Sequence, residues 1–333
     1  MTLGHENQGI PLGLEVIGSS LESAFCDYAE NFSLEPWSYW KIGGSARAVI
    51  WPSSTIGVQK AAAFALERKL PVSIVGRSTN ILFSSGRIDS IIINLERYMK
   101  KIEIRDNIVY AQAGAYVPDL AFVVARKGLS GLEHIAGIPG TVGGLVTMNG
   151  GSLRKSISSN IVSVTSVNRS GELIKRKLEE CMFSYRNSIF KKNNEIILDV
   201  TLSLNKGEVD EILSSMREIL RSRREKFPLH LPNCGSVFIS DPQLYEAWGP
   251  PGKILEECGL KGARIGEVMV SDVHANFIVN IGHGRSVDVL RLVQLMRKKV
   301  YDHTGVWLKT EPLFLDESGL IWNMGDYLFK NPI

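Results

Sequence analysis

The sequence has little cysteine, no long apolar run and almost no net charge. Its 333 residues include four cysteines (Cys26, Cys181, Cys234 and Cys258), which are far apart and form no C-x-x-C pair. This spacing argues against a disulfide framework and against a zinc site, so we expect no metal. Because 38 basic residues nearly balance 35 acidic ones, the charge gives no indication of a nucleic-acid partner.

The sequence also lacks the signals of membrane insertion and export. It contains no stretch of about 18 apolar residues, which a membrane span requires. Its first thirty residues do not combine a basic start with a long apolar run, so they do not resemble a signal peptide. With 44% hydrophobic residues, the chain is too apolar for disorder. We therefore expect a folded, cytoplasmic protein without membrane contact, made of two or three packed units.

Hydrophobic periodicity indicates three segments. Residues 1–37 are weakly patterned and are interpreted as an N-terminal extension. Residues 38–206 contain many short strand-like runs between helices, so they predict an α+β unit. Residues 207–333 predict a smaller α/β unit that begins with a helix at 207–227. Within these units we expect helices at 118–126, 253–258 and 286–301, and strands at 46–51, 102–105, 108–112 and 275–280.

Glycine, by contrast, is abundant and clustered. The chain has 31 glycines, and eight of them lie in the 24 residues from Gly128 to Gly151. Such a run removes Cβ atoms, exposes backbone N–H groups and permits positive φ, so that the chain can wrap an anion or a flat ring. An isolated glycine pair would indicate no more than a tight turn. The run therefore predicts a phosphate or dinucleotide cradle.

The common glycine cradles do not fit this run. No G-x-G-x-x-G fingerprint is present, and Gly252-Lys253 is followed by Ile254 rather than by serine or threonine. A second loop at 76–80 follows a buried strand and offers N–H groups and hydroxyl donors. Gly43-Gly44 and Gly114 add two sites of close backbone approach. The cradle must therefore belong to another fold.

Eight short motifs follow one another along the chain. They are Trp40–Gly44, Gly76–Asn80, Gly131–Gly144, Phe183–Ser188, Gly235–Phe238, Gly259–Gly262, Val270–Phe277 and Val306–Glu311. Each is weak alone, but in this order they resemble the UDP-N-acetylenolpyruvoylglucosamine reductase (MurB) family of flavoenzymes over about residues 37–315.

The resemblance implies a fold and a cofactor. FAD would be bound non-covalently by an N-terminal domain of the vanillyl-alcohol-oxidase (PCMH) type, at residues 38–206. A smaller α/β domain at 207–333 would bind the substrate. The chain lacks a long insertion after Gly235-Ser236, which suggests the type II branch of the family. We expect a monomer.

The resemblance also implies a reaction. NADPH would reduce FAD, and hydride from flavin N5 would pass to the β-carbon of UDP-N-acetylglucosamine enolpyruvate, giving UDP-N-acetylmuramate for peptidoglycan synthesis. Because negative charge builds on the substrate carboxylate and a proton must reach the α-carbon, the site needs a cation and a proton donor. The resemblance assigns the cation to Arg186, proton donation to Ser236, and further stabilisation of the enolate to Glu311.

Binding residues follow from the same resemblance. Flavin contacts are expected at Val75, Gly76, Arg77, Ser78, Thr79, Asn80, Ile81, Gly114, Ala115, Ile138, Pro139, Gly140, Thr141, Gly143, Gly144, Met148, Asn149 and Ile197. The nucleotide-sugar substrate is expected to contact Tyr185, Lys226, Ser240 and His274. Two of these have competing interpretations, since Lys226 belongs to a solvated basic run and a structural role for His274 is an equal alternative.

Some positions depart from the family pattern. Ser78 stands where the family usually has glycine, residues 239–242 (Ile-Ser-Asp-Pro) replace Lys-Asn-Pro, and Lys309 replaces an acid. These changes leave two alternatives open. One is another flavin oxidoreductase of the same fold, such as a sugar oxidase or a divergent paralogue, and the other is a non-catalytic flavin-binding protein. The three intact catalytic positions argue against the second.

Overall fold

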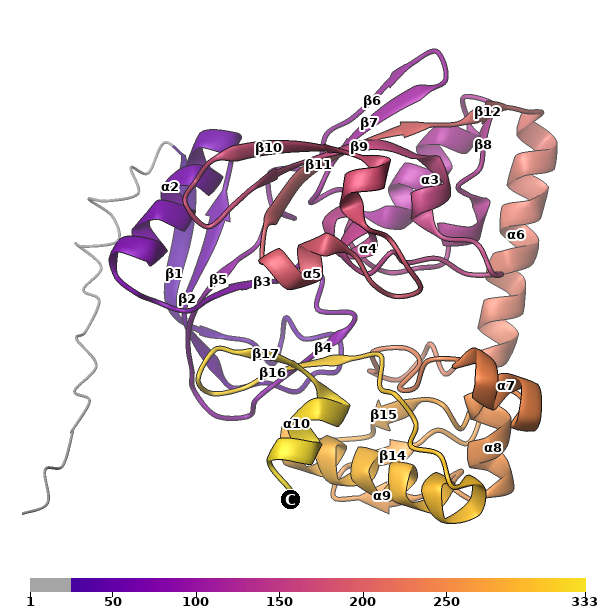
Figure 1. Cartoon of the computed structure of the whole chain (residues 1–333). Helices are drawn as coiled ribbons and strands as arrows, with labels where there is room; N and C mark the ends of the chain where they lie inside the picture. The colour runs from indigo at the N-terminus through magenta and orange to yellow at the C-terminus, as the bar shows by residue number, and fades with distance from the viewer. Residues whose placement is uncertain (1–24) are drawn as a thin grey trace, which may run out of the picture.

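Two parts, joined by the long helix α6 (Val209–Lys226), make up the chain (Figure 1). The computed structural model describes residues 25–333, so most of the predicted extension at 1–37 lies outside the described residues. In Figure 1 the N-terminal part, with both larger sheets, lies above the C-terminal part, and α6 runs along one side from one to the other. Across residues 25–333, no helix is long and apolar enough to cross a membrane.

The first sheet has the strand order β1-β2-β5-β3. Its strands are β1 (Cys26–Ser33), β2 (Ser45–Pro52), β5 (Ile88–Ile93) and β3 (Val72–Ile74). β1 is antiparallel to β2, whereas β5 is parallel to both of its neighbours. Because β1 pairs with β2, the sheet begins before the predicted boundary at residue 38. Helix α2 (Thr55–Glu67), which is capped by the Ser54 side chain, packs on β2.

The second sheet is antiparallel and has the order β10-β9-β11-β7-β6. Its strands are β10 (Leu173–Lys177), β9 (Ile161–Val167), β11 (Ile196–Ser203), β7 (Ile108–Gln112) and β6 (Ile102–Arg105). One continuous apolar core joins this sheet to the first sheet and to helices α3 (Val117–Ala125) and α4 (Val142–Thr147). Shorter elements are β8 (Leu129–Ser130), η1 (Glu133–Ile135), η2 (Ile157–Asn160), η3 (Leu178–Cys181), α5 (Ile189–Asn193) and β12 (Asn205–Lys206).

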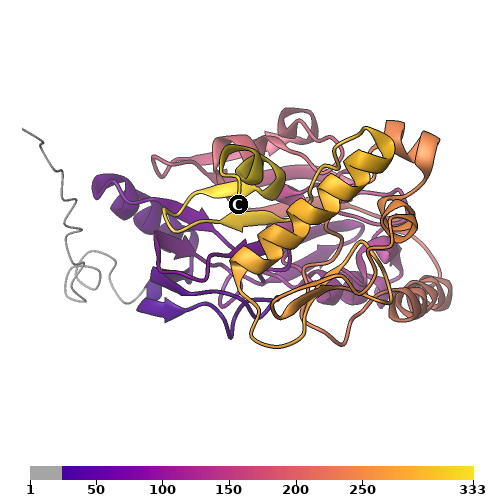
Figure 2. The same cartoon turned by 90° about the horizontal axis from the view of Figure 1, so that it is seen from below.

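The C-terminal part is built on a short antiparallel sheet. Its strands are β13 (Arg264–Ile265), β14 (Val268–Val270) and β15 (Ile278–Asn280), accompanied by helices α7 (Pro242–Trp248), α8 (Pro251–Glu257) and α9 (Ser286–Thr304). Seen from below, α9 lies across this part beside the C-terminal hairpin (Figure 2). One face of α9, with Val289, Val293 and Met296, is buried in the core.

The two parts share a sheet and a core. The shared sheet contains β4 (Ile81–Phe83), β16 (Leu313–Leu315) and β17 (Ile321–Asn323), and α10 (Met324–Lys330) follows it. β4, from the first part, runs parallel to β16, from the second. Trp40, which precedes the first part's β2, is fully buried in the core of the C-terminal part. Its Nε1 donates a hydrogen bond to Ile278 O at 2.9 Å. Chain segments therefore cross the predicted division at residue 207 in both directions.

Most predicted elements of residues 38–333 have counterparts in the structure. The predicted strands at 102–105 and 108–112 coincide with β6 and β7. The strand predicted at 275–280 is shorter, because Phe277 N donates to His274 O and closes a turn before β15 begins. The turn ends the extended backbone on the N-terminal side of β15.

Candidate functional site

A cavity of about 1500 Å³ lies between the two parts. The glycine loops at 76–80 and 137–144 line it from the N-terminal part, together with much of the segment 186–197. From the other side it is lined by the end of α6, by residues 227–236 and by Glu311. The loops that glycine marks in the sequence and the candidate catalytic residues therefore meet in one site.

The glycine loops pack directly against neighbouring chain, and this closeness explains several of the glycines. A Cβ on Gly76 would overlap the hydroxyl of Thr141, and a Cβ on Gly114 would overlap Leu95 O. Thr141 in turn caps α4, because its Oγ1 accepts a hydrogen bond from Gly144 N at 3.3 Å. Gly76 and Gly114 therefore serve chain packing at the cavity wall.

Other glycines leave bare backbone facing the cavity. Among the described residues, a Cβ on Gly140 would touch only Thr79 Oγ1, at 3.5 Å, and one on Gly144 would touch only Thr141 Oγ1, at 3.4 Å. Both glycines line the cavity. Side chains there would take up room that a ligand needs, so this cradle fits a flat, phosphate-bearing cofactor such as FAD.

The pair Gly43-Gly44 does not contribute to this cradle. A Cβ on Gly44 would overlap the backbone of Gly86, and neither Gly43 nor Gly44 lines the cavity. The close approach expected at this pair is therefore between two segments of the chain.

The cavity carries more positive than negative side chains. Its lysine and arginine side chains are Lys41, Arg77, Arg186, Lys191, Lys192 and Arg223, and its carboxylates are Glu96, Glu195, Glu311 and Asp326. This excess of positive charge attracts anionic ligands, a class that includes dinucleotides and nucleotide sugars.

All of the predicted flavin contacts except Ala115 and Asn149 line the cavity. Ala115 is buried behind it, where its carbonyl oxygen accepts a hydrogen bond from Val142 N at 2.9 Å. Asn149 is also buried, and its Nδ2 donates to Ser184 O at 3.0 Å. These two residues hold the loops of the wall in place, and their direct contact with a flavin stays a prediction.

Arg186 and Glu311 form an ion pair inside the cavity. The distance from Arg186 Nε to Glu311 Oε1 is 2.8 Å, and the two side chains are 22% and 19% exposed. Within residues 25–333 the Nε–H forms no hydrogen bond of good geometry, while Nη2 donates to Gly151 O at 3.2 Å. Arg186 therefore keeps hydrogen-bond donors for an anionic ligand.

Ser236 lies next to Glu311 because the two segments that carry them run side by side. Glu311 N donates to Val237 O at 2.8 Å. Before Ser236, Gly235 adopts a left-handed conformation with φ of +79°, and its N–H donates to Asn233 Oδ1 at 2.9 Å. This turn places Ser236 in the wall of the cavity, so the structure brings all three predicted catalytic residues together.

The ionisation of Glu311 is perturbed by its surroundings. Burial raises the pKa of its carboxyl, and the positive charges of Arg186 and Lys191 oppose that rise. Burial also lowers the pKa of the Lys191 amine, and the negative charge of Glu311 opposes that change. Perturbed groups in a cleft are typical of functional sites. Lys191 is not among the residues predicted from the sequence, although it follows the motif at 183–188 by three positions.

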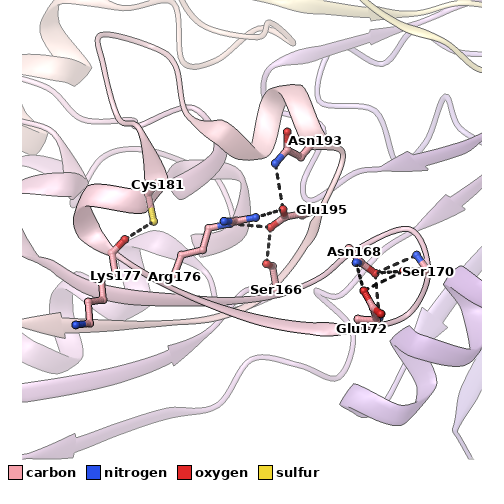
Figure 3. Close-up of polar contacts among 9 residues, drawn as sticks. All are labelled: Ser166, Asn168, Ser170, Glu172, Arg176, Lys177, Cys181, Asn193 and Glu195. Carbon is pink, nitrogen blue, oxygen red and sulfur yellow. Dashed lines mark hydrogen bonds and ion pairs between the residues drawn. The ribbon is translucent and has the colours of Figure 1, made fainter.

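Glu195 forms part of the cavity wall and is held by a network of polar side chains (Figure 3). Its carboxylate accepts hydrogen bonds from Ser166 Oγ at 2.7 Å, Arg176 Nε at 3.2 Å and Asn193 Nδ2 at 3.2 Å, and pairs with Arg176 Nη2 as well. Burial raises the pKa of Glu195, but these partners outweigh it and hold the pKa below its usual value. The network joins β9, β10 and the end of α5 to the start of β11.

The four residues predicted to bind the nucleotide sugar lie outside the lining of the cavity. Tyr185 is 56% exposed beside Arg186, and Lys226 and Ser240 are also exposed. His274 packs its ring against Phe227 and Phe277, with centroids 5.6 and 5.0 Å away. The His274 contacts fit the structural alternative, and substrate binding by all four residues stays a prediction.

The three departures from the family pattern have structural explanations. Ser78 adopts a left-handed conformation with φ of +56°, which accounts for glycine as the usual residue there. Its Oγ accepts a hydrogen bond from Tyr39 N at 2.9 Å, which a glycine would not provide. The other two changes are coupled, because Lys309 Nζ lies 2.7 Å from Asp241 Oδ2 in an ion pair.

Two family models match the chain. Residues 46–176 match an FAD binding domain, and residues 227–315 match the C-terminal domain of UDP-N-acetylenolpyruvoylglucosamine reductase. Together with the glycine cradle and the perturbed carboxylate, these matches define a flavin-binding oxidoreductase.

Proteins of similar sequence and structure identify the family within this class. UDP-N-acetylenolpyruvoylglucosamine reductase 1 of Corynebacterium glutamicum is 42% identical over 308 residues, covering 91% of this chain and 92% of that protein. The Alkaliphilus oremlandii reductase is 36% identical over 278 residues, covering 84% and 90%. The crystal structure of UDP-N-acetylenolpyruvylglucosamine reductase (MurB) from Thermus caldophilus has a TM-score of 0.73 at 28% identity, covering 87% and 98%. The chain belongs to the UDP-N-acetylenolpyruvoylglucosamine reductase family, and the predicted family and α+β flavin-binding fold are confirmed.

Proposed function

We propose that this chain reduces UDP-N-acetylglucosamine enolpyruvate to UDP-N-acetylmuramate for peptidoglycan synthesis, with FAD bound in the cavity and NADPH as the electron donor. The observation that carries the proposal is the meeting of Arg186, Ser236 and Glu311 with the glycine cradle in one cavity. A monomeric state and a cytoplasmic location remain part of the proposal.

The three catalytic residues have separate tasks in this proposal. When bound, FAD supplies the hydride that reaches the β-carbon of the enolpyruvyl group. The guanidinium of Arg186 binds the substrate carboxylate and stabilises the negative charge that builds there. Ser236 gives the proton of its hydroxyl to the α-carbon and regains one from solvent. Glu311 orients Arg186 and hydrogen-bonds the developing enolate when its carboxyl is protonated, a state that burial favours.

The test separates the two half-reactions of the holoenzyme. In Ser236→Ala, NADPH should still bleach the flavin at the wild-type rate, whereas anaerobic reoxidation by the enolpyruvyl nucleotide should slow by roughly 10²–10⁴-fold, the usual share of a proton donor. Stopped-flow absorbance of the flavin measures both steps.

Ser215→Ala is the matched control, because Ser215 is an exposed serine on α6. Equal losses in both half-reactions of Ser236→Ala would contradict the role of Ser236. If the reduced wild-type flavin ignored the nucleotide and reacted rapidly with oxygen, the oxidase alternative would replace this proposal.

A further inference from the structure

Lys191, on the short helix α5, lines the cavity, where it contacts one of the three proposed catalytic residues and its charge acts on another. Its Nζ donates a hydrogen bond to Arg186 O at 3.3 Å, and its charge acts on Glu311. No carboxylate of residues 25–333 lies within salt-bridge distance of Nζ. Partial burial of an ammonium without an ion-pair partner costs desolvation free energy, so Lys191 needs a compensating role at this position.

The contact with Arg186 supports an unfavourable backbone conformation. Arg186 has a φ of +54°, in the left-handed region that costs a residue with a Cβ about 1–2 kcal/mol. Ser184 and Asn187 exchange two backbone hydrogen bonds of 3.1 Å across this turn, and Lys191 adds a third bond at the carbonyl of Arg186 itself. The turn sets the direction in which the guanidinium leaves the backbone.

Helix α5 is itself fixed at its far end. Asn194, directly after the helix, is left-handed with φ of +51°, and Asn193 donates to Glu195, whose carboxylate is also bound by Arg176 (Figure 3). The position of Lys191 is therefore defined on both sides, by the turn before α5 and by the Glu195 network after it.

We propose that Lys191 is a positioning residue for the reaction at this site: its hydrogen bond to Arg186 O fixes the left-handed turn that aims Arg186 into the cavity, and it adds a second positive charge to the cavity that Glu311 lines. The inference rests on the proposed function, because that function makes Arg186 and Glu311 catalytic.

The charges around Glu311 determine what removal of Lys191 should do. Arg186 comes from the turn before α5, Lys191 from α5 itself, and Asp326 of α10 is a further charged group lining the same cavity. Both cations favour the carboxylate form of Glu311, so the loss of one must raise the pKa of Glu311. Lys206 of β12 is exposed and lies outside the cavity lining, so its loss should leave Glu311 unchanged.

The experiment uses four holoenzyme variants. Lys191→Met removes both the hydrogen bond and the charge, Lys191→Gln removes the charge but retains a donor, and Lys191→Arg retains the charge. Lys206→Met is the control, because it removes an exposed lysine outside the cavity lining. Flavin reoxidation by the enolpyruvyl nucleotide should fall by roughly 10–100-fold in Lys191→Met, the scale of a misplaced catalytic group, because the turn that carries Arg186 loses its support. This loss should outweigh any gain from the larger protonated fraction of Glu311 in the same variant. Lys191→Arg should recover most of that loss.

A second measurement does not depend on turnover. Infrared difference spectra of the holoenzyme across a pH series give the titration of Glu311, identified as the carboxyl band that Glu311→Gln removes. The midpoint should move to higher pH in Lys191→Met and Lys191→Gln, and stay in place in Lys191→Arg and Lys206→Met. An unmoved midpoint, or reoxidation within twofold of wild type in Lys191→Met, overturns the proposal. If wild-type enzyme does not use the nucleotide, the proposed function fails, while the infrared titration still decides whether Lys191 acts on Glu311.

Discussion

Ser78 illustrates how one side chain can offset an unfavourable backbone. Its φ of +56° suits glycine, yet its hydroxyl oxygen accepts a hydrogen bond from Tyr39 N and lies 3.3 Å from Trp37 O. These contacts tie the loop at 76–80 to the segment before Trp40. A serine at this position therefore carries backbone strain, but its hydroxyl connects the loop at 76–80 to the segment that contains Tyr39.

We expect Ser78→Ala to be less stable than wild type by about 1–2 kcal/mol, because the Tyr39 N–H loses its acceptor while the left-handed strain remains. Ser78→Gly should lie between the two, since glycine loses the same bond but relieves the strain. Urea denaturation of the three proteins measures the order. An alanine variant as stable as wild type would show that the hydroxyl contributes nothing.

At the scale of elements, the cavity depends on how the short helix α5 is attached to the second sheet. The Glu195 carboxylate gathers groups from β9, β10 and α5 at the point where β11 begins. The Glu195 side chain is only 3% exposed, and the dense hydrogen bonding around its carboxylate fits this burial. Ile197, two residues after Glu195, also lines the cavity, so this attachment fixes the position of that part of the cavity wall.

The Glu195 network should make stability depend on pH. The pKa of Glu195 in the folded protein lies below its ordinary value of 4.5, so its contribution is complete at neutral pH and is lost as the pH falls through the folded-state pKa. Glu195→Gln should therefore cost about 1.5–3 kcal/mol at pH 7, the range for hydrogen bonds to a charged group. The difference from wild type should shrink in acid.

Urea denaturation at neutral and acid pH measures both values for Glu195→Gln. Glu179→Gln, at an exposed glutamate of η3, is the control and should show no such pH dependence. A gap between wild type and Glu195→Gln that stayed constant with pH would mean that the carboxylate charge does not matter.

How far the sequence predicts these elements depends on where their signals lie. β6 and β7 have local strand patterns and were predicted to the residue. β1 was missed, because its polar sequence CDYAENFS carries no apolar alternation and its partner β2 supplies the order. β4 and β16 were missed for another reason, since strands of three buried residues have too few positions to show a period.

The same distinction applies to the site. The glycine loops and the residues of the matched motifs were predicted, because their signal is local and their order is specific. Lys191 was not, since its importance comes from a contact with Arg186 O and from the charge of Glu311, far away in sequence. Gly44 shows the reverse case, because a local glycine signal there reflects packing against Gly86.

At the scale of the whole molecule, the two parts form a connected unit around the cavity. Trp40 and Leu82, from the first part, are buried in the core of the second, and β4 pairs with β16. Residues from both parts line the cavity. A ligand that fills the cavity would therefore touch residues of both parts.

We expect calorimetry to show one unfolding transition, and FAD to shift it upward as a whole. A ligand that binds only the folded state stabilises it by about 2.7 kcal/mol at one hundred times its Kd, so removal of FAD should lower the Tm of both parts together. Two separate transitions, only one of which responded to FAD, would show that the parts unfold independently.

The pairing of β4 with β16 also has a consequence for synthesis on the ribosome. β4 (Ile81–Phe83) is translated long before β16 (Leu313–Leu315). Contacts between such distant segments slow folding. Until they form, apolar side chains such as Leu82 and Phe83, which are fully buried in the folded protein, remain exposed to solvent. The nascent flavin-binding part must therefore remain unfinished until β16 has been made, and cofactor capture has to wait for the C-terminal part.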